Sequence, residues 1–223
     1  MLRFGFFFCV LLAIGANAEF CYNDVDKACS SMLTSGSQLA SCNAKYGHFM
    51  DIEPELQSYA NAHIETSFDY LLMSTHFGSY EANREGLKGY FRKLSDKAWK
   101  EGIEIIKFIT KRGGTMNFNQ PPRFKPTMAK KSTLALNELN SLARALDTEK
   151  QLAEEAFRMY GQALQHSKLD PSVAHYLEEE FIEGQADTIR TLAGHTSDLT
   201  KLLRVKDNSL SVFLFDEYLQ KTL

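Results

Sequence analysis

Four long segments carry apolar residues three or four positions apart, the spacing that puts them on one face of an α-helix. Their approximate limits are residues 54–78, 83–112, 126–166 and 170 onward. A short apolar segment, Leu210 to Leu219, closes the chain. A helix with a single apolar stripe is stable only when that stripe is buried against other helices. The sequence therefore predicts an all-α fold, a four-helix bundle with a short fifth helix at the C-terminal end.

The connection between the second and third helices is long. Residues 113–127 contain Gly113, Gly114 and three prolines, and most links between antiparallel neighbours are shorter. A link of this length lets the third helix start at the opposite end of the bundle. We therefore expect one long crossover between helices 2 and 3. Residues 51–221 show no repeat and no second domain, so they are expected to form one bundle domain.

The first eighteen residues have the order of a secretory signal peptide. Arg3 supplies the positive start, residues 4–14 form the apolar core, and Ala16-Asn17-Ala18 is a small-x-small cleavage site. The alternative, a membrane anchor, is disfavoured because the apolar run is too short to span a bilayer. We expect cleavage between Ala18 and Glu19, with residues 19–50 as an N-terminal extension. The expected location is the secretory pathway or the extracellular space.

Three cysteines lie in this extension: Cys21, Cys29 and Cys42. In an oxidising compartment an odd number predicts one internal disulfide and one cysteine left to bond another chain. The alternative is a buried free thiol. The sequence does not decide the pairing, but we favour Cys21 with Cys42, which leaves Cys29 for a partner.

The overall charge limits the classes of partner. The net charge is −3, and 44% of the residues are hydrophobic, which is ordinary for a globular protein. A basic nucleic-acid-binding protein is therefore not expected.

Polar residues interrupt the apolar stripe once on each long helix. They are His63, Glu101, Glu149 and Gln185, and Tyr70 can bring a hydroxyl nearby. A buried carboxylate is costly unless it is paired, hydrogen-bonded or bound to a metal. Two carboxylates, an imidazole and an amide can hold a hard metal ion. The alternative is a metal-free network in which one carboxylate pairs with His63 and Gln185 donates a hydrogen bond.

Several short motifs together resemble the ferritin family over about residues 50–221. They are Tyr70-Leu71-Leu72-Met73-Ser74 with Phe77, Lys111-Arg112-Gly113-Gly114, Ala145-Leu146 with Glu149-Lys150, and Leu214-Phe215-Asp216. With the signal peptide and the cysteine-bearing extension, the chain is similar to the secreted ferritins of insects. The resemblance implies a ferritin-like bundle in a shell of twenty-four subunits. Such a shell stores iron as ferric mineral and needs no organic cofactor.

The same resemblance bears on catalysis, because ferritin heavy chains oxidise Fe(II) at a di-iron site inside the bundle. Three of the family's ligand positions are changed here, to His63, Ala98 and Glu101. The third-helix glutamate, the fourth-helix glutamine and the nearby tyrosine are kept as Glu149, Gln185 and Tyr70. Alanine cannot bridge two irons, so the resemblance implies a non-catalytic, light-chain-type subunit that co-assembles with a heavy chain. The alternatives are a slow ferroxidase using the remaining ligands and a secreted four-helix signalling protein.

Other positions are also assigned by the resemblance. Light chains carry mineral-seeding glutamates on the cavity face of the second helix, where this chain has Lys93, Asp96, Lys97 and Lys100. Asp96, Glu101 and Glu104 are the acids left there as candidate metal ligands. Glu178 and His175 occupy the positions that line the threefold channel. The loop at Lys111 and Arg112 and the fifth helix are expected to make contacts between subunits.

Overall fold

The structure is a computed structural model and describes residues 21–22, 24–25, 42–123, 137–204 and 208–222. The long helices are α2 (Phe49–Phe77), α3 (Glu85–Lys111), α4 (Glu138–Ala163) and α6 (Glu183–Leu202). A short helix α5 (Pro171–Leu177) and a π-helical turn η1 (Glu178–Ile182) run directly into α6, and α7 (Asn208–Thr222) is last. The predicted cleavage site and Cys29 lie outside the described residues. In the described parts every element is helical, and the predicted fold class is confirmed.

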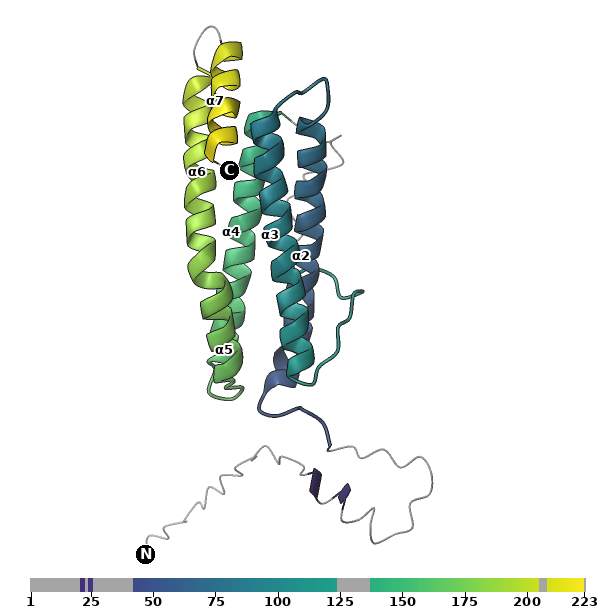
Figure 1. Cartoon of the computed structure of the whole chain (residues 1–223). Coiled ribbons are helices and arrows are strands. Elements are labelled where there is room, and N and C mark those ends of the chain that lie inside the picture. Colours follow the sequence, from purple (N-terminus) through teal and green to yellow (C-terminus); the bar gives the residue numbers. More distant parts are fainter. Residues whose placement is uncertain (1–20, 23, 26–41, 124–136, 205–207, 223) are drawn as a thin grey trace, which may run out of the picture.

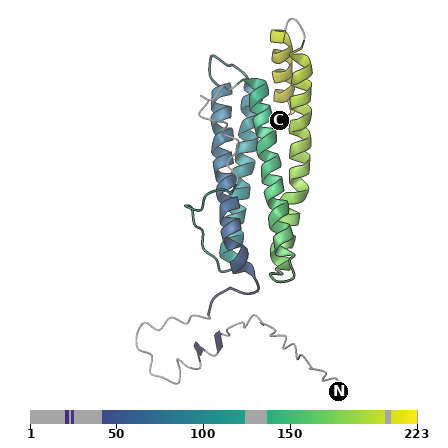
Figure 2. The same cartoon turned by 180° about the vertical axis from the view of Figure 1, so that it is seen from behind.

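The helices form the expected bundle. In both views, α2 lies beside α3, α4 lies beside the rod made of α5, η1 and α6, and α7 packs near one end (Figures 1 and 2). The long crossover leaves α3 at the other end, and its described part runs back along α2 (Figure 1). Asn61 Nδ2 holds this part by donating to the carbonyl oxygens of Asn117 (3.0 Å) and Gln120 (2.7 Å). Among the described helices, none is long and apolar enough to cross a membrane.

Two predicted helix starts were wrong. α2 begins at Phe49 rather than at Pro54, because Phe49 and Ile52 are buried and their packing extends the helix across the proline. α4 begins at Glu138 rather than near Pro126. Asn137 is extended and its side chain accepts a hydrogen bond from the Asn140 amide, which is the arrangement that starts a helix. Residues 126–136 lie outside the described part.

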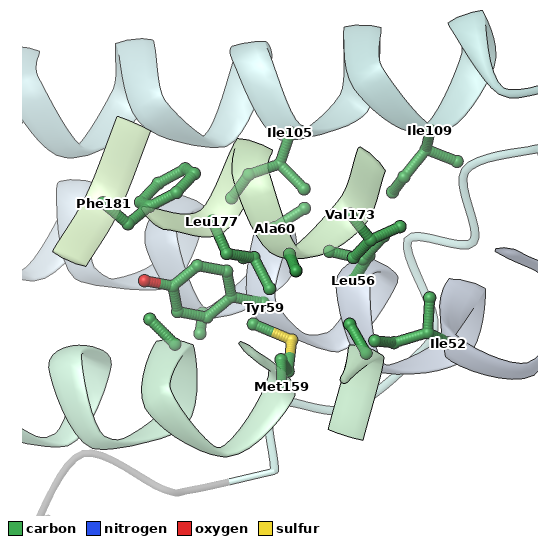
Figure 3. Close-up of a cluster of buried hydrophobic side chains, with 14 of the residues drawn as sticks. Ile52, Leu56, Tyr59, Ala60, Ile105, Ile109, Met159, Val173, Leu177 and Phe181 are labelled. Carbon is green, nitrogen blue, oxygen red and sulfur yellow. The ribbon is translucent and has the colours of Figure 1, made fainter. Parts of the chain in front are cut away.

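The apolar stripes meet in two clusters. One lies toward the crossover end, where side chains of α2, α3, α4, α5 and η1 point toward one another around Leu56 and Leu177 (Figure 3). The second lies toward α7, around Leu94 and Leu192. Three residues assigned to the stripes are instead more than half exposed: Phe68 (54%), Leu72 (56%) and Phe157 (56%). They stand at the edges of their stripes, where the helical surface turns away from the core of one subunit.

A buried ion pair closes the crossover end. Arg112 Nη1 and Nη2 donate to Asp170 Oδ1 and Oδ2 at 3.1 and 2.8 Å, and Arg112 is only 3% exposed. Arg112 therefore stabilises its own subunit, and the expectation that the loop at Lys111 and Arg112 makes contacts between subunits stays a prediction. Asp170 also caps α5 by accepting from the Val173 amide, as predicted. In the described part of the N-terminal extension, the structure contains the Cys21–Cys42 disulfide, the pairing favoured from the sequence.

Candidate functional site: a polar layer in the middle of the bundle

Between the two apolar clusters lies a set of polar side chains that we call the central layer. It comprises Tyr59, His63 and Tyr70 from α2, Lys97 and Glu101 from α3, Glu149 from α4 and Gln185 from α6. The four interruptions noted in the sequence all belong to it. His63, Glu149 and Gln185 are buried, and the Glu101 side chain is 19% exposed. Helical spacing therefore predicted these inward positions.

Glu101 lies between two basic groups. Its Oε2 is 3.3 Å from His63 Nδ1, and its Oε1 is 3.6 Å from Lys97 Nζ. Burial by itself would raise the pKa of Glu101, but the contact with His63 and the Lys97 charge outweigh it and hold the pKa below its usual value. Lys97 also donates to Thr188 of α6. Glu101 is thus an ionised carboxylate with its charge already matched by protein groups.

Glu149 has a different environment. Its Oε1 accepts a hydrogen bond from the Tyr70 hydroxyl at 2.8 Å. Burial raises the pKa of Glu149 although this hydrogen bond opposes the change. Burial, followed by the charge of Glu149, also raises the pKa of Tyr70 well above its usual value. The bundle therefore disfavours a negative charge at Glu149, whereas it stabilises one at Glu101.

Gln185 and His63 are linked through Tyr59. Gln185 Nε2 donates to the Tyr59 hydroxyl at 3.0 Å, and the Tyr59 ring meets the His63 ring edge-on at 4.5 Å between centroids. The hydroxyl of Tyr59 points away from Ile52 and Ile109, toward the middle of the bundle (Figure 3). Within the described residues, His63 Nε2 and Gln185 Oε1 have no hydrogen-bond partner. The metal-free alternative predicted that His63 pairs with a carboxylate, and it pairs with Glu101. That alternative did not predict that Gln185 donates to Tyr59.

The layer does not gather its acids around one point. In the described part of the chain, no three His, Cys, Asp or Glu residues form a group able to hold a metal ion. Ala98 is 2% exposed and has no ligand atom. Beside it, the Lys97 ammonium contacts Glu101 and repels cations. In the described structure, the polar groups of this layer contact one another, and their oxygen atoms do not converge on a shared point where a metal ion could bind.

The outer candidate ligands are also paired with bases. Asp96 is 2.9 Å from Arg92, and Glu104 is 2.7 Å from Lys107. Both pairs connect neighbouring turns of α3 and are well exposed, so each contributes little to stability. A carboxylate that already faces an arginine or lysine is a weaker attractor for iron than a free one.

The channel candidates lie at the surface of this subunit. Glu178 begins η1 and is exposed, and His175 Nε2 is 3.3 Å from Glu179 Oε2. The π-helical turn follows His175 and carries three consecutive glutamates, while Phe181 on the same turn is buried. The three glutamates are therefore exposed at the surface, whereas Phe181 packs against Tyr59 and His63.

Comparison with known proteins decides the family. The ferritin family model, described as a ferritin-like domain, matches residues 54–202. The chain belongs to the ferritin family. It is 49% identical to a ferritin light chain of Trichoplusia ni, with 96% of each chain covered. It is 46% identical to a ferritin light chain of Drosophila melanogaster, covering 94% of this chain and 93% of that one.

A solved ferritin structure agrees. The crystal structure of Trichoplusia ni secreted ferritin aligns with a TM-score of 0.84 at 47% identity, covering 92% of this chain and all of that one. The resemblance to secreted insect ferritins of the light-chain type, first seen in short motifs, is confirmed.

Two members of this ferritin's central layer were missed from the sequence. Lys97 precedes Glu101 by four residues, and Tyr59 precedes His63 by four. Residues four apart on a helix are neighbours, so this spacing was the available signal. Lys97 was instead assigned to the cavity face, and Tyr59 did not stand out in a segment rich in apolar residues.

Proposed function

We propose that this chain is a non-catalytic, light-chain-type subunit of a secreted ferritin shell that stores iron as ferric mineral. A heavy-chain-type partner in the same shell of twenty-four subunits oxidises Fe(II), and iron is the cargo. The observation that carries the proposal is the central layer. Ala98 supplies no ligand, and the Lys97 ammonium faces Glu101 where a ferroxidase would have to place iron.

The relatives support the remaining parts of the proposal. Similar chains are named ferritin light chains, and the matched crystal structure is of a secreted ferritin. We assign residues 1–18 to a signal peptide cut between Ala18 and Glu19, residues 19–50 to the extension, and residues 51–221 to the bundle. Cys29, outside the described residues, is assigned an interchain disulfide. The location is the secretory pathway and the extracellular fluid.

Surface features are consistent with assembly into a shell. Phe68, Leu72 and Trp99 are large apolar side chains exposed on one side of the α2–α3 pair, and Phe68 and Trp99 are in edge-on contact. Contact with another subunit would bury them. We propose that Glu178, with His175 one turn before it, lines a cation path where copies of α5 and η1 converge, because converging carboxylates attract hydrated cations.

The test is Fe(II) oxidation by the purified mature chain, followed by oxygen consumption, with the assembly size measured in the same sample. The expected rate for this chain alone does not exceed that of buffer. The double variant Ala98→Glu, Glu101→His restores two ligands and is expected to oxidise Fe(II). Glu101→His alone is the control, because it adds an imidazole without the bridging carboxylate. A rapid, saturable rate in the unchanged chain would overturn the light-chain assignment.

A slow ferroxidase is the second candidate, favoured by one observation. His63 Nε2 and Gln185 Oε1 are buried without a hydrogen-bond partner in the described structure. Both atoms can act as ligands of a metal ion. If the remaining candidate ligands bind iron, Glu149→Gln and His63→Leu each lower a measurable slow rate. If the proposed function is correct, neither variant changes the background rate.

A further inference from the structure

The first turn of α3 is capped from a distant part of the chain. Its N-cap residue, Arg84, makes no side-chain capping hydrogen bond. The cap comes from α7: Asp216 Oδ1 accepts from the Leu87 amide at 2.8 Å, and Oδ2 accepts from the Gly86 amide at 3.1 Å. Asp216 is only 7% exposed. A buried carboxylate on the free amides of a helix start is a strong, charge-assisted contact.

The backbones of the two helices also meet at this point. A Cβ atom added to Gly86 would lie 2.0 Å from the Asp216 carbonyl oxygen, closer than any real contact. Position 86 must therefore be glycine for α7 to reach the start of α3. The cap and the close backbone approach are parts of one contact between Gly86 and Asp216, which are 130 positions apart.

The rest of α7 is divided between a buried and an exposed apolar face. Val212, Phe215 and Leu219 are buried in the cluster at this end of the bundle. The outward face carries four large apolar side chains that are more than half exposed, Leu210, Phe213, Leu214 and Tyr218. The exposed face can be presented to another subunit in one defined orientation only while α7 stays docked.

We propose that Asp216 is the positioning residue that locks α7 onto α3, and that α7 is a strap that opens when this contact is lost. Packing of Phe215 and its neighbours holds α7 against the bundle but does not fix its position along α3. The carboxylate and Gly86 fix where along α3 the strap sits. A consequence, which rests on the proposed function, is that an unlocked strap lowers the yield of closed shells.

The lock is tested by amide hydrogen exchange of the full mature chain, read by mass spectrometry on peptides covering 212–219. Asp216→Ala is expected to speed exchange of these peptides roughly 5- to 30-fold, the change produced by losing one helix cap. Glu217→Ala removes the same charge one position along and serves as the matched control. Gly86→Ala is the second route, because its added Cβ pushes α7 away from α3 without changing the Asp216 side chain itself.

The outcomes separate a lock from general destabilisation. Peptides from α4 must exchange at the unchanged rate in Asp216→Ala and Gly86→Ala, which shows that the bundle is intact. If Asp216→Ala fails to fold, Asp216→Asn, which keeps one acceptor oxygen, is expected to give a smaller increase confined to α7. Unchanged α7 exchange in both Asp216→Ala and Gly86→Ala would overturn the proposal.

Shell formation is scored separately by native mass spectrometry. Fewer closed shells in the unlocked variants than in Glu217→Ala support the consequence, and equal yields overturn it. If the unchanged chain forms no shell with any partner but its α7 is protected, the proposed function fails and the lock stands.

Discussion

Two regions of this bundle bury charged side chains, and they do so in opposite ways. At the crossover end, Arg112 and Asp170 form a bidentate pair, and the Arg112 guanidinium also lies over the rings of Tyr46 (4.2 Å) and Phe49 (5.0 Å). In the central layer the groups are spread over four helices and matched unevenly. Glu101 has two basic neighbours, whereas Glu149 has a tyrosine hydroxyl.

The difference separates a structural pair from an altered binding site. The side chains of Arg112 and Asp170 are both buried. Their hydrogen bonds connect the end of α3, the start of α5 and the segment before α2. The central layer keeps residue types that suit metal binding, but it pairs them with one another: Glu101 with His63 and Lys97, and Glu149 with Tyr70. Single substitutions are therefore expected to cost more at the end than in the middle.

The largest effect is expected for Arg112→Met. It leaves the Asp170 carboxylate buried without its counter-ion, which typically costs about 3–5 kcal/mol of unfolding free energy. Urea unfolding followed by circular dichroism measures this loss. The double variant Arg112→Met, Asp170→Asn removes both charges and is expected to recover part of it, because Asn still caps α5. Equal losses in the single and double variants would show that the unpaired Asp170 charge is not the cause of the loss.

A smaller loss is expected for Glu101→Gln, about 1–3 kcal/mol at neutral pH, since it removes a charged partner of His63 and Lys97. The pKa of Glu101 is lowered in the folded chain, so its stabilising effect is present above the unfolded pKa. That effect disappears as the pH falls through the folded pKa. The difference in unfolding free energy between the parent and Glu101→Gln must therefore shrink under acid conditions.

The smallest effect, and the opposite sign, is expected for Glu149→Gln. Burial raises the pKa of Glu149, so its negative charge destabilises the fold at neutral pH. Gln keeps an acceptor for the Tyr70 hydroxyl and removes the charge, which is expected to stabilise the chain by up to about 1 kcal/mol. The gain is full above the raised pKa and is lost as the parent becomes protonated at lower pH. Thermal unfolding across this pH range measures it, and a loss of stability at neutral pH would contradict the contrast with Glu101.

The sequence predicted the parts of this molecule that depend on local pattern. Apolar spacing placed His63, Glu101, Glu149 and Gln185 on inward faces, and Asp170-Pro171 correctly marked the start of α5, which continues through η1 into α6. Helix starts failed where packing or capping outweighed proline, at Phe49 and Glu138. The predicted burial of Phe68 and Phe157 was wrong. Periodicity predicts a wide apolar stripe, but it does not show which edge of the stripe is buried within one subunit.

The choice of partner within the central layer depended on three dimensions. The position of a residue in the helical repeat predicts that its side chain points into the bundle. Which neighbour the side chain contacts depends on how each helix is rotated about its axis and on the side-chain rotamer. Lys97 could have faced the surface and instead contacts Glu101 and Thr188, and Gln185 bonds to Tyr59 rather than to a carboxylate. Arg112 likewise stands in a loop motif that gives no sign of its burial.

By itself, the sequence determined the bundle fold, the crossover and the family, because these follow from periodicity, loop length and motifs read along the chain. Only the tertiary structure decided how the buried charges are matched and how α7 is held. Asp216 caps a helix that starts 131 positions earlier, and Arg112 pairs with an acid 58 positions later. Contacts between residues so far apart depend on how the whole bundle packs, which no local pattern encodes.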